Sequence, residues 1–286
     1  MIMIENVRVL DERRIVLEAP AFPWQHVRKI GEDIVATELL FPRHHRITPY
    51  CLGALLTGGV FSVPVIRKPQ VRIIPTGTEL VDWRATPLAD VRPGQVLETN
   101  SFVLGRLVEE CGGIYTRNEM VSDNIAGIKS AVEKAVGDGC DCVLILGGSS
   151  AGAEDYARAA IEDLGEVLVH GITIMPGKPA VIGVVRETPV FGMPGYPVSA
   201  IIVFEQLVRL LLTALLKQPE PECEKVTVTP TRKMASKLGL EEFVRVKLGD
   251  VAGRIVAPPL PRGAGSITSL TEADGIIRIP ADTEGL

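Results

Sequence analysis

Apolar residues in the middle of the chain follow two different spacings. Short apolar runs with the length and composition of buried strands stand at residues 71–74, 141–146, 181–185 and 189–191. Segments whose apolar residues recur every three or four positions predict helices, and these begin at Asn100, Asn124, Asp155 and Pro197. Strands that alternate with helices indicate an α/β fold, with a mostly parallel sheet flanked by helices.

The spacing changes on both sides of this region, which predicts three domains. Residues 1–67 mix a short β-like opening with turns and one helix, for which Thr48 and Pro49 have the form of an N-cap and a first-turn proline. We expect a partial N-terminal or linker domain there. Residues 68–219 form the predicted α/β domain. Residues 220–286 hold short β-branched runs separated by Gly and Pro, which predicts a C-terminal β-barrel domain.

The composition disfavours several classes of protein. The 286 residues are 46% hydrophobic and 23% charged, with a formal net charge of −5 and no dense Lys/Arg tract, so we expect no nucleic-acid partner. Residues 200–216 are apolar but interrupted by Glu205, Gln206 and Arg209, which favours a largely buried helix over a membrane span. The N-terminus shows no secretory signal, and the five scattered cysteines do not form a disulfide framework. We therefore expect a cytoplasmic protein without a membrane partner.

Two further patterns favour structural roles. Cys140 and Cys142 form a C-x-C pair, but Cys142 begins an apolar strand, where cysteine packs as a small hydrophobe, and a zinc site needs four converging ligands. His170 stands at the end of another predicted strand, where a single histidine is more often structural than catalytic. The four histidines of the chain form no convincing Ser-His-Asp constellation.

Glycine-rich loops follow the predicted strands, at residues 75–80, 147–156, 175–179 and 192–199. Ligands of open α/β sheets bind outside the carboxyl ends of the strands. Glycine lets the backbone approach an anion there, and backbone N–H groups and helix N-termini favour negative charge. Ser149, Ser150 and Ser199 add hydroxyl donors and Lys178 adds a positive charge, so the loops together predict a phosphate-binding cradle. None of them is a P-loop or a dinucleotide fingerprint.

Three acidic residues are expected at the same edge of the sheet: Glu79, Asp123 and Asp155. Carboxylates beside a bound phosphate repel it unless a divalent cation lies between them. Mg²⁺ suits this arrangement, because it binds one or two carboxylates together with substrate oxygens. Asp123 and Asp155 have a second interpretation, since each stands where a helix begins and could simply cap it. Both interpretations stay open from the sequence.

Several short motifs occur in a fixed order along the chain. They are Pro-Thr-Gly-Thr-Glu-Leu (75–80), Thr-Asn-Ser (99–101), Val-Ser-Asp (121–123), Gly-Gly-Ser-Ser-Ala-Gly (147–152) with Asp155, Pro-Gly-Lys-Pro (176–179) and Met-Pro-Gly-Tyr-Pro-Val-Ser (193–199). Pro23-Trp24, Gly-Glu-Asp-Ile (31–34) and Thr48-Pro49 precede them. With these motifs the sequence resembles, over nearly its whole length, the molybdopterin molybdenumtransferase family, which includes MoeA and the E domain of gephyrin.

The resemblance implies an activity and a set of site residues. Family members insert molybdate into adenylylated molybdopterin and release AMP, with Mg²⁺, and their middle domain has a molybdopterin-binding, MogA-like fold. Carried over by position, Glu79, Asp123 and Asp155 belong to the metal and molybdate cluster and, with Lys178, to the catalytic residues. The residues implied to bind the pterin substrate are Thr76, Gly77, Gly147, Gly148, Ser149, Ser150, Gly152, Pro194, Gly195, Pro197 and Ser199. A homodimer and a molybdopterin adenylyltransferase are the implied protein partners.

The chain departs from the family at several positions. Gly171 and Met175 stand where members often carry lysine, and Tyr196 replaces a frequent asparagine. Members also have a longer region ahead of residue 20, including a domain that contributes to the active site across a dimer, so we expect that most of the N-terminal region is lacking here. Two alternatives stay open: a non-catalytic molybdopterin-binding or scaffold module, and a MogA-like molybdopterin adenylyltransferase. The second is disfavoured, because the Gly-Gly-Thr-Gly signature of that family is not found.

Overall fold

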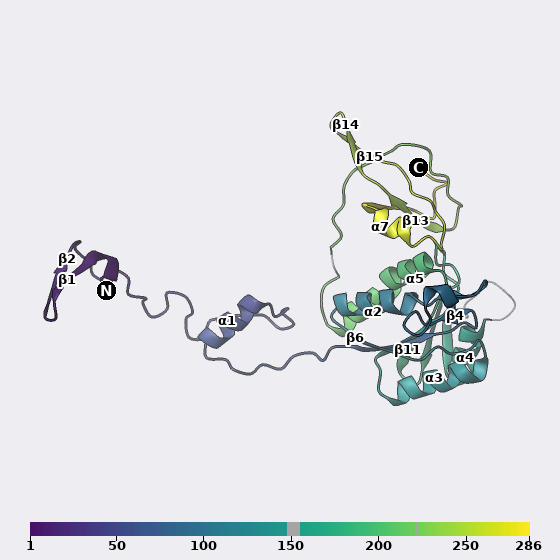
Figure 1. Ribbon diagram of the computed structural model, residues 1–286, viewed down its shortest axis with the longest axis horizontal. Helices are drawn as coiled ribbons and strands as arrows, with labels where there is room; N and C mark the ends of the chain where they lie inside the picture. Colours follow the sequence, from purple (N-terminus) through teal and green to yellow (C-terminus); the bar gives the residue numbers. More distant parts are fainter. Residues whose placement is uncertain (148–154, 221) are drawn as a thin grey trace. The chain divides into compact units, whose positions relative to one another are not determined.

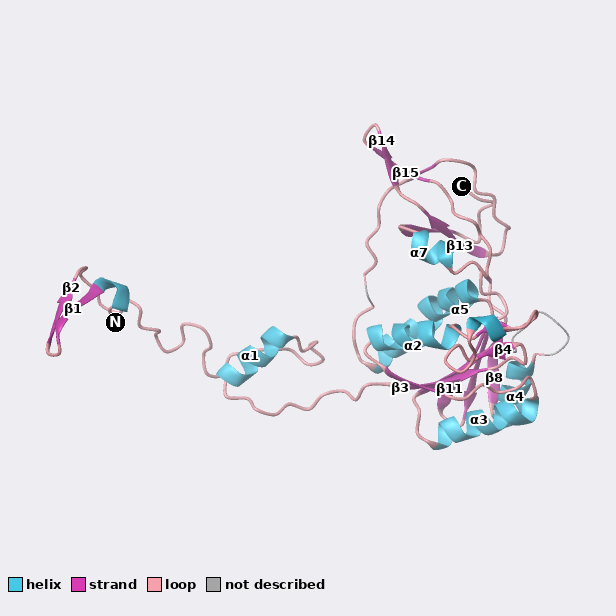
Figure 2. Ribbon diagram, in the orientation of Figure 1, coloured by secondary structure: helices cyan, strands magenta, loops and turns pink. Residues whose placement is uncertain are grey.

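The computed structural model describes residues 1–147, 155–220 and 222–286. It divides into two compact units, residues 1–65 and residues 66–286. Figures 1 and 2 show the helices and strands of both units.

The N-terminal unit contains little regular structure. Its elements are a 3₁₀ turn (Ile4–Asn6), the antiparallel strands β1 (Val7–Asp11) and β2 (Arg14–Leu17), and helix α1 (Pro49–Thr57). The predicted start of α1 is confirmed, because the Cys51 N–H donates to the Thr48 hydroxyl at 3.4 Å and Pro49 lies in the first turn. Cys51 is the one buried residue of residues 1–65, all of which the structure describes. This unit therefore has almost no core of its own.

A six-stranded sheet forms the centre of the second unit (Figure 1). Across the sheet, the strands are β6 (Ile114–Arg117), β3 (Gln70–Pro75), β7 (Cys142–Leu146), β11 (Thr188–Met193), β10 (Val181–Val185) and β8 (Glu166–His170). The first four are parallel, whereas β10 runs antiparallel to both β11 and β8. The predicted α/β fold with a mostly parallel sheet is confirmed. The edge strand β6 was not predicted, because its residues form no apolar run.

Helices cover both faces of this sheet (Figure 2). They are α2 (Asn100–Glu110), α3 (Ile125–Gly137), α4 (Tyr156–Leu164), α5 (Pro197–Val203), a π-helical segment (Phe204–Val208) and α6 (Arg209–Leu215). Alternate residues of β7 explain why its apolar run is continuous. Leu144 packs into the core shared with α2, α5 and α6, whereas Val143 and Ile145 pack into the core shared with α3 and α4.

The stretch Pro197–Leu215 has the length and composition of a membrane span, but half of its most apolar window is buried within the protein. Phe204, Val208 and Leu212 are fully buried in the same core as α2. The sequence-based prediction of a largely buried helix agrees with this packing.

The C-terminal part is β-rich. One three-stranded sheet contains β12 (Thr229–Pro230), β15 (Arg254–Ala257) and β14 (Gly249–Val251), and the other contains β16 (Gly275–Ile279), β13 (Glu241–Val246) and β9 (Ile174–Met175). Helix α7 (Thr268–Glu272) lies in the same part of the chain. The α/β part also contains the paired strands β4 (Leu80–Val81) and β5 (Val96–Leu97) and a 3₁₀ turn (Leu88–Asp90). Because β9 precedes β10 in the chain but pairs with β13, the α/β part supplies an edge strand to a C-terminal sheet. Val198, Ile202 and Phe243 share a small core that joins the two parts.

A buried ion pair ties β6 to the start of α2. The Glu98 carboxylate is 2% exposed and accepts hydrogen bonds from the Ser101 N–H at 2.8 Å and from Arg117 Nη2 at 3.1 Å. Arg117 also lies over the Phe102 ring, with 5.4 Å between the guanidinium carbon and the ring centroid. Removing one partner of such a pair leaves the other charge buried and uncompensated.

We expect Glu98→Ala to lower the free energy of unfolding by about 3–5 kcal/mol, the usual cost of breaking a buried pair. Glu109→Ala is the matched control on α2, because the Glu109–Arg106 pair is exposed and should contribute less than about 1 kcal/mol. Urea unfolding followed by circular dichroism measures both. Equal losses in the two variants would show that burial does not set the strength of the Glu98 pair.

Candidate active site at the carboxyl edge of the sheet

The strand register brings the ends of five strands to one edge. Pro75 pairs with Leu146, and Leu146 pairs with Met193, so β3, β7 and β11 end side by side. An isolated bridge from Thr76 to Val121 brings the segment after β6 to the same place. On the other side, β8 ends at His170, which lies opposite Val181 at the start of β10. The turns that begin at residues 75, 147 and 192 leave the sheet at this edge, and residues 175–179 lead into β10 there.

The backbone is closely packed where β3, β7 and β11 end. The Thr76 N–H donates to the Leu146 carbonyl at 2.8 Å, and the Gly147 N–H donates to the Met193 carbonyl at 3.1 Å. Gly147 has φ of 92°, and a Cβ at this position would lie 2.6 Å from the Thr76 carbonyl oxygen. Only glycine fits both constraints without a shift of the backbone. Gly195 lies close by, since a Cβ on it would be 3.9 Å from the Gly147 Cα.

Two of the predicted acidic residues lie beside the turn after β3. The Gly77 N–H donates to the Val121 carbonyl at 3.2 Å, and the Thr78 N–H donates to Asp123 Oδ2 at 3.1 Å. The exposed Glu79 side chain folds back over Gly77, because a Cβ on Gly77 would be 3.0 Å from both Glu79 carboxylate oxygens. The interpretation of Asp123 as a helix cap is wrong. Asn124 caps α3 instead, with its Oδ1 accepting from the Gly127 N–H at 2.7 Å.

Asp155 does cap a helix, and it also contacts a histidine. Its Oδ1 accepts from the Arg158 N–H at 2.9 Å at the start of α4, and its Oδ2 lies 3.2 Å from His170 Nε2. The Asp155 side chain is 10% exposed and that of His170 is 48% exposed. The sequence did not indicate this pair, because Asp155 precedes α4 and His170 ends β8, so their contact depends on how these two elements pack. Each carboxylate oxygen keeps a second lone pair that can accept from, or ligate, another group.

Lys178 and Ser199 differ in how they can reach a ligand. Lys178 is exposed, its carbonyl accepts from the Ile172 N–H at 2.9 Å, and its ammonium has no partner among the residues that the structure describes. Ser199 is 5% exposed in the first turns of α5. Pro194 is buried and Pro197 is half-buried at the entrance to the same helix. Of these four residues, the lysine alone is exposed.

Two contacts at this edge were not predicted. The Asn100 side-chain amide donates to the Gly195 carbonyl at 2.7 Å, which ties the start of α2 to the loop after β11. The Val198 N–H donates to the Ala264 carbonyl at 3.0 Å. A carbonyl of the C-terminal part therefore accepts a hydrogen bond from one of the N–H groups at the start of α5. The Asn100 signal was present in the Thr-Asn-Ser motif, whereas nothing near residue 264 indicated a role beside this loop.

The described residues contain no group of three or more His, Cys, Asp or Glu side chains placed to hold a metal ion. Glu79, Asp123 and Asp155 therefore do not form a ready-made cage. Mg²⁺ does not require one, since it commonly binds one or two carboxylates plus substrate phosphates, so the acidic residues fit this mode. Cys142 does not, because burial raises the pKa of its thiol above the usual range and disfavours the thiolate that a metal needs. Gly148, Ser149, Ser150 and Gly152, four of the predicted binding residues, lie outside the described residues.

Three regions of the chain match known protein families. The family described as "Probable molybdopterin binding domain" matches residues 72–217, which contain the whole six-stranded sheet except the first two residues of β3. The MoeA N-terminal region (domain I and II) matches residues 1–59, and the MoeA C-terminal region (domain IV) matches residues 227–286. The chain belongs to the MoeA family.

Individual relatives agree with this assignment. The structure of a molybdopterin biosynthesis MoeA protein from Pyrococcus horikoshii is 36% identical, with a TM-score of 0.76 over 99% of this chain and 68% of that one. Molybdopterin molybdenumtransferase 2 of Mycobacterium tuberculosis is 29% identical over 94% of this chain. The molybdopterin molybdenumtransferase of Bacillus subtilis is 29% identical over 100% of it. The chain spans 66% of the length of each of these two curated relatives.

Gly147→Ala should destabilise the protein by about 1–3 kcal/mol, because it places a methyl group against the Thr76 carbonyl in a backbone conformation that favours glycine. Gly137→Ala is the control: it lies at the end of α3 with open space around its Cβ, so it should be neutral or slightly stabilising. Thermal unfolding compares the two. A Gly147→Ala protein as stable as the wild type would contradict the close packing of the strand ends.

Proposed function

We propose that this chain inserts molybdate into adenylylated molybdopterin and releases AMP, in the synthesis of the molybdenum cofactor. Its membership of the MoeA family supports this proposal, together with relatives that are named molybdopterin molybdenumtransferase. The observation that carries it is the meeting of the glycine-containing turns and the acidic residues at one edge of the sheet, as the register from Pro75 through Leu146 to Met193 requires.

The turns at this edge are suited to hold the phosphate groups of the substrate. The N–H groups of Thr76, Gly77 and Gly147 donate to neighbouring carbonyls, so these residues would contribute by leaving the strand ends open to a ligand. Gly148, Ser149, Ser150 and Gly152 follow Gly147 in the sequence. Pro194, Gly195, Pro197 and Ser199 form the third turn, which enters α5. Backbone N–H groups and small residues allow close approach of an anion without a competing side chain.

The acidic residues would then bind Mg²⁺ jointly with the substrate. Glu79 and Asp123 lie on either side of the turn at Gly77 and Thr78, and Asp155 lies at the start of α4. A bound Mg²⁺ would neutralise charge between these carboxylates and the phosphate and molybdate oxygens. Lys178 would contact an anionic oxygen through its ammonium, which has no partner in the described part of the chain. His170 holds one Asp155 oxygen and the Arg158 N–H holds the other, which fixes the direction of the carboxylate.

The direct test is turnover with adenylylated molybdopterin, Mg²⁺ and molybdate. We expect AMP release that depends on molybdate, and a loss of about 100-fold in Asp155→Asn, an order typical of removing one electrostatic group from an active site. Asn can still cap α4, so this variant should fold normally. Asp163→Asn, on the same helix, removes an equal charge from an exposed pair with Lys129 and should leave turnover unchanged.

A second outcome would support the non-catalytic alternative. Gly171 and Met175 carry no charge where family members often have lysine, so Lys178 is the one cation of the Pro-Gly-Lys-Pro loop. If the wild-type chain binds the pterin but releases no AMP, it is a molybdopterin-binding or scaffold module and the transferase proposal is wrong. The adenylyltransferase alternative has less support, because it does not account for the match of residues 227–286 to the MoeA C-terminal region.

We further propose that the chain acts as a homodimer in which the N-terminal unit packs against a second copy. Residues 1–65 bury almost nothing by themselves, and α1 exposes Tyr50 (89%), Leu52 (54%) and Leu56 (59%). Apolar surface of this extent is stabilised when another surface covers it.

Light scattering coupled to size-exclusion chromatography tests this dimer. The wild-type chain should have twice its monomer mass of 30.8 kDa. The double variant Leu52→Glu/Leu56→Glu should be monomeric, because buried carboxylates cannot be paired across an apolar interface. Leu238→Glu, a control at a 61% exposed position in the C-terminal part, should remain dimeric. A monomeric wild type, or equal dissociation of both variants, would argue against α1 as the interface.

The proposed reaction also bears on which enzyme supplies the substrate and on where in the cell the chain works. An adenylylated substrate requires an adenylyltransferase upstream, and we propose that enzyme as a partner of this chain. The five cysteines form no disulfide, and a cytoplasmic location suits this state.

A further inference from the structure

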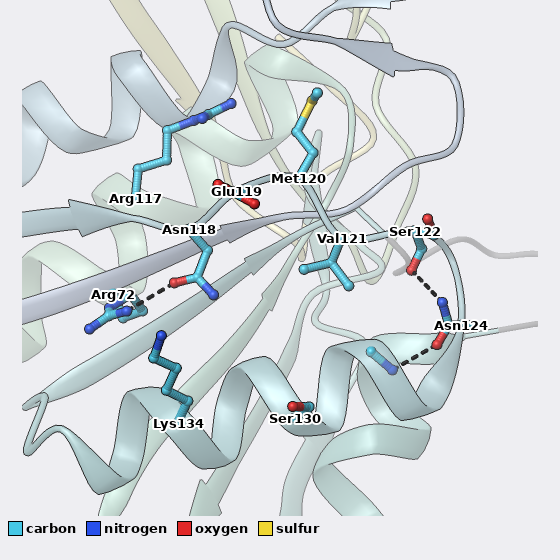
Figure 3. Close-up of a pocket in the computed structure, with 11 residues that line it drawn as sticks. Arg72, Arg117, Asn118, Glu119, Met120, Val121, Ser122, Asn124, Ser130 and Lys134 are labelled. Carbon is cyan, nitrogen blue, oxygen red and sulfur yellow. Dashed lines mark hydrogen bonds between the residues drawn. The ribbon is translucent and has the colours of Figure 1, made fainter.

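A pocket of about 700 Å³ lies between the edge strand β6 and helix α3 (Figure 3). Residues from β3, from the end of β6 and the segment after it, and from α3 line it. It exists because side chains alternate along β3: Val71 and Ile73 pack toward α2, whereas Arg72 projects toward α3. The described residues form no strand beyond β6, so the side of α3 next to Arg72 is left uncovered.

The Arg72 guanidinium is held by two hydrogen bonds, but one of its N–H groups has no acceptor among the described residues. Its Nη1 donates to Asn118 Oδ1 at 3.0 Å, and its Nη2 donates to Asp138 Oδ2 at 2.8 Å. The side chain is 16% exposed, and its buried Nε has no hydrogen-bond partner among the described residues. A buried donor without an acceptor is costly, so such groups usually mark a missing partner.

Two more donors face the same space. The Lys134 side chain points from α3 toward Arg72 and Asn118 (Figure 3), and its ammonium has no acceptor within the described parts of the chain. Lys129, on the same helix, is instead paired with Asp163 at 2.9 Å. Since the Asn118 oxygen is occupied by Arg72, its amide nitrogen remains to donate.

The lining thus offers more donors than acceptors. Arg117 also lines the pocket but is neutralised by Glu98 and Asp82, at 3.1 and 3.5 Å. Glu119 is the one acidic side chain among the lining residues. Within the described residues, no carboxylate forms an ion pair with Lys134, and the Asn118 amide nitrogen beside it has no acceptor either.

We propose that this pocket binds a phosphate group, free or carried by a small metabolite, with Lys134 and Asn118 as its direct donors. A phosphate oxygen accepts several charge-assisted hydrogen bonds at once, which matches a lysine beside an amide and a fixed arginine. The volume is in the range of small-molecule sites and leaves room for a group attached to the phosphate. Val121, Ser122 and Asn124 line the end of the pocket that adjoins the carboxyl edge, whereas Lys134 and Asn118 lie at its other end. The proposal does not depend on the reaction proposed at that edge.

Titration of the full chain with inorganic phosphate and with ribose 5-phosphate, at low ionic strength, tests the site. Calorimetry gives affinities, and the Asn118 side-chain amide signal in ¹H–¹⁵N spectra reports binding locally. Lys134→Gln should weaken binding by about tenfold, the usual effect of losing one hydrogen bond to a charged group. Lys129→Gln, which removes the same charge from the same helix, should change the affinity less than about twofold. Tighter binding of ribose 5-phosphate identifies a metabolite, and equal binding identifies the phosphate alone.

Lys178→Gln separates this site from the carboxyl edge. If phosphate binding falls in Lys178→Gln but not in Lys134→Gln, the anion binds at the edge only and the proposal is overturned. No shift of the Asn118 amide at saturating phosphate overturns it as well. Thermal unfolding of each variant shows that the comparison is made between equally folded proteins.

Discussion

The in-register pairing of β7 with β3 on one side and β11 on the other is the constraint on which the rest depends. It places Pro75, Leu146 and Met193 in one row. The turns that follow are then close enough for backbone hydrogen bonds to pass from Thr76 to Leu146 and from Gly147 to Met193. A shift of one residue in β7 would exchange the two cores that its alternate side chains fill, so burial fixes the register and thereby the site.

The same register determines where the glycine turn and the carboxylates lie along the edge. Where β3 and β7 meet, Gly147 keeps the backbone free of side chains, and the acidic residues stand to either side of it. Asp123 is tied to the turn after β3 through Thr78, whereas Asp155 is tied to α4 and to His170. Each of these two carboxylates is thus positioned by its own local hydrogen bonds. A substrate with several oxygens could bind a cation jointly with them.

The sequence predicted the central strands and helices well, because their apolar runs and periodicities reflect burial on known faces. Asn124 and Pro197 marked helix starts correctly for a different reason, since an N-cap and a first-turn proline act locally in the chain. The edge strand β6 was missed because a short strand at the edge of a sheet needs no continuous apolar run. The contacts between Asp155 and His170, and between Val198 and Ala264, could not be predicted, because they depend on how distant loops meet in three dimensions. The pocket beside Lys134 depends in the same way on β6 being the last strand.

A crystal structure of the chain with AMP and Mg²⁺ tests the central claim most directly. The account predicts the AMP phosphate at the carboxyl edge, with its oxygens about 3 Å from backbone N–H groups of the turns that begin at Thr76, Gly147 and Gly195. At least one carboxylate of Glu79, Asp123 and Asp155 should ligate the cation. AMP bound on another surface, with these turns free of ligand, would contradict the assignment of this edge as the active site.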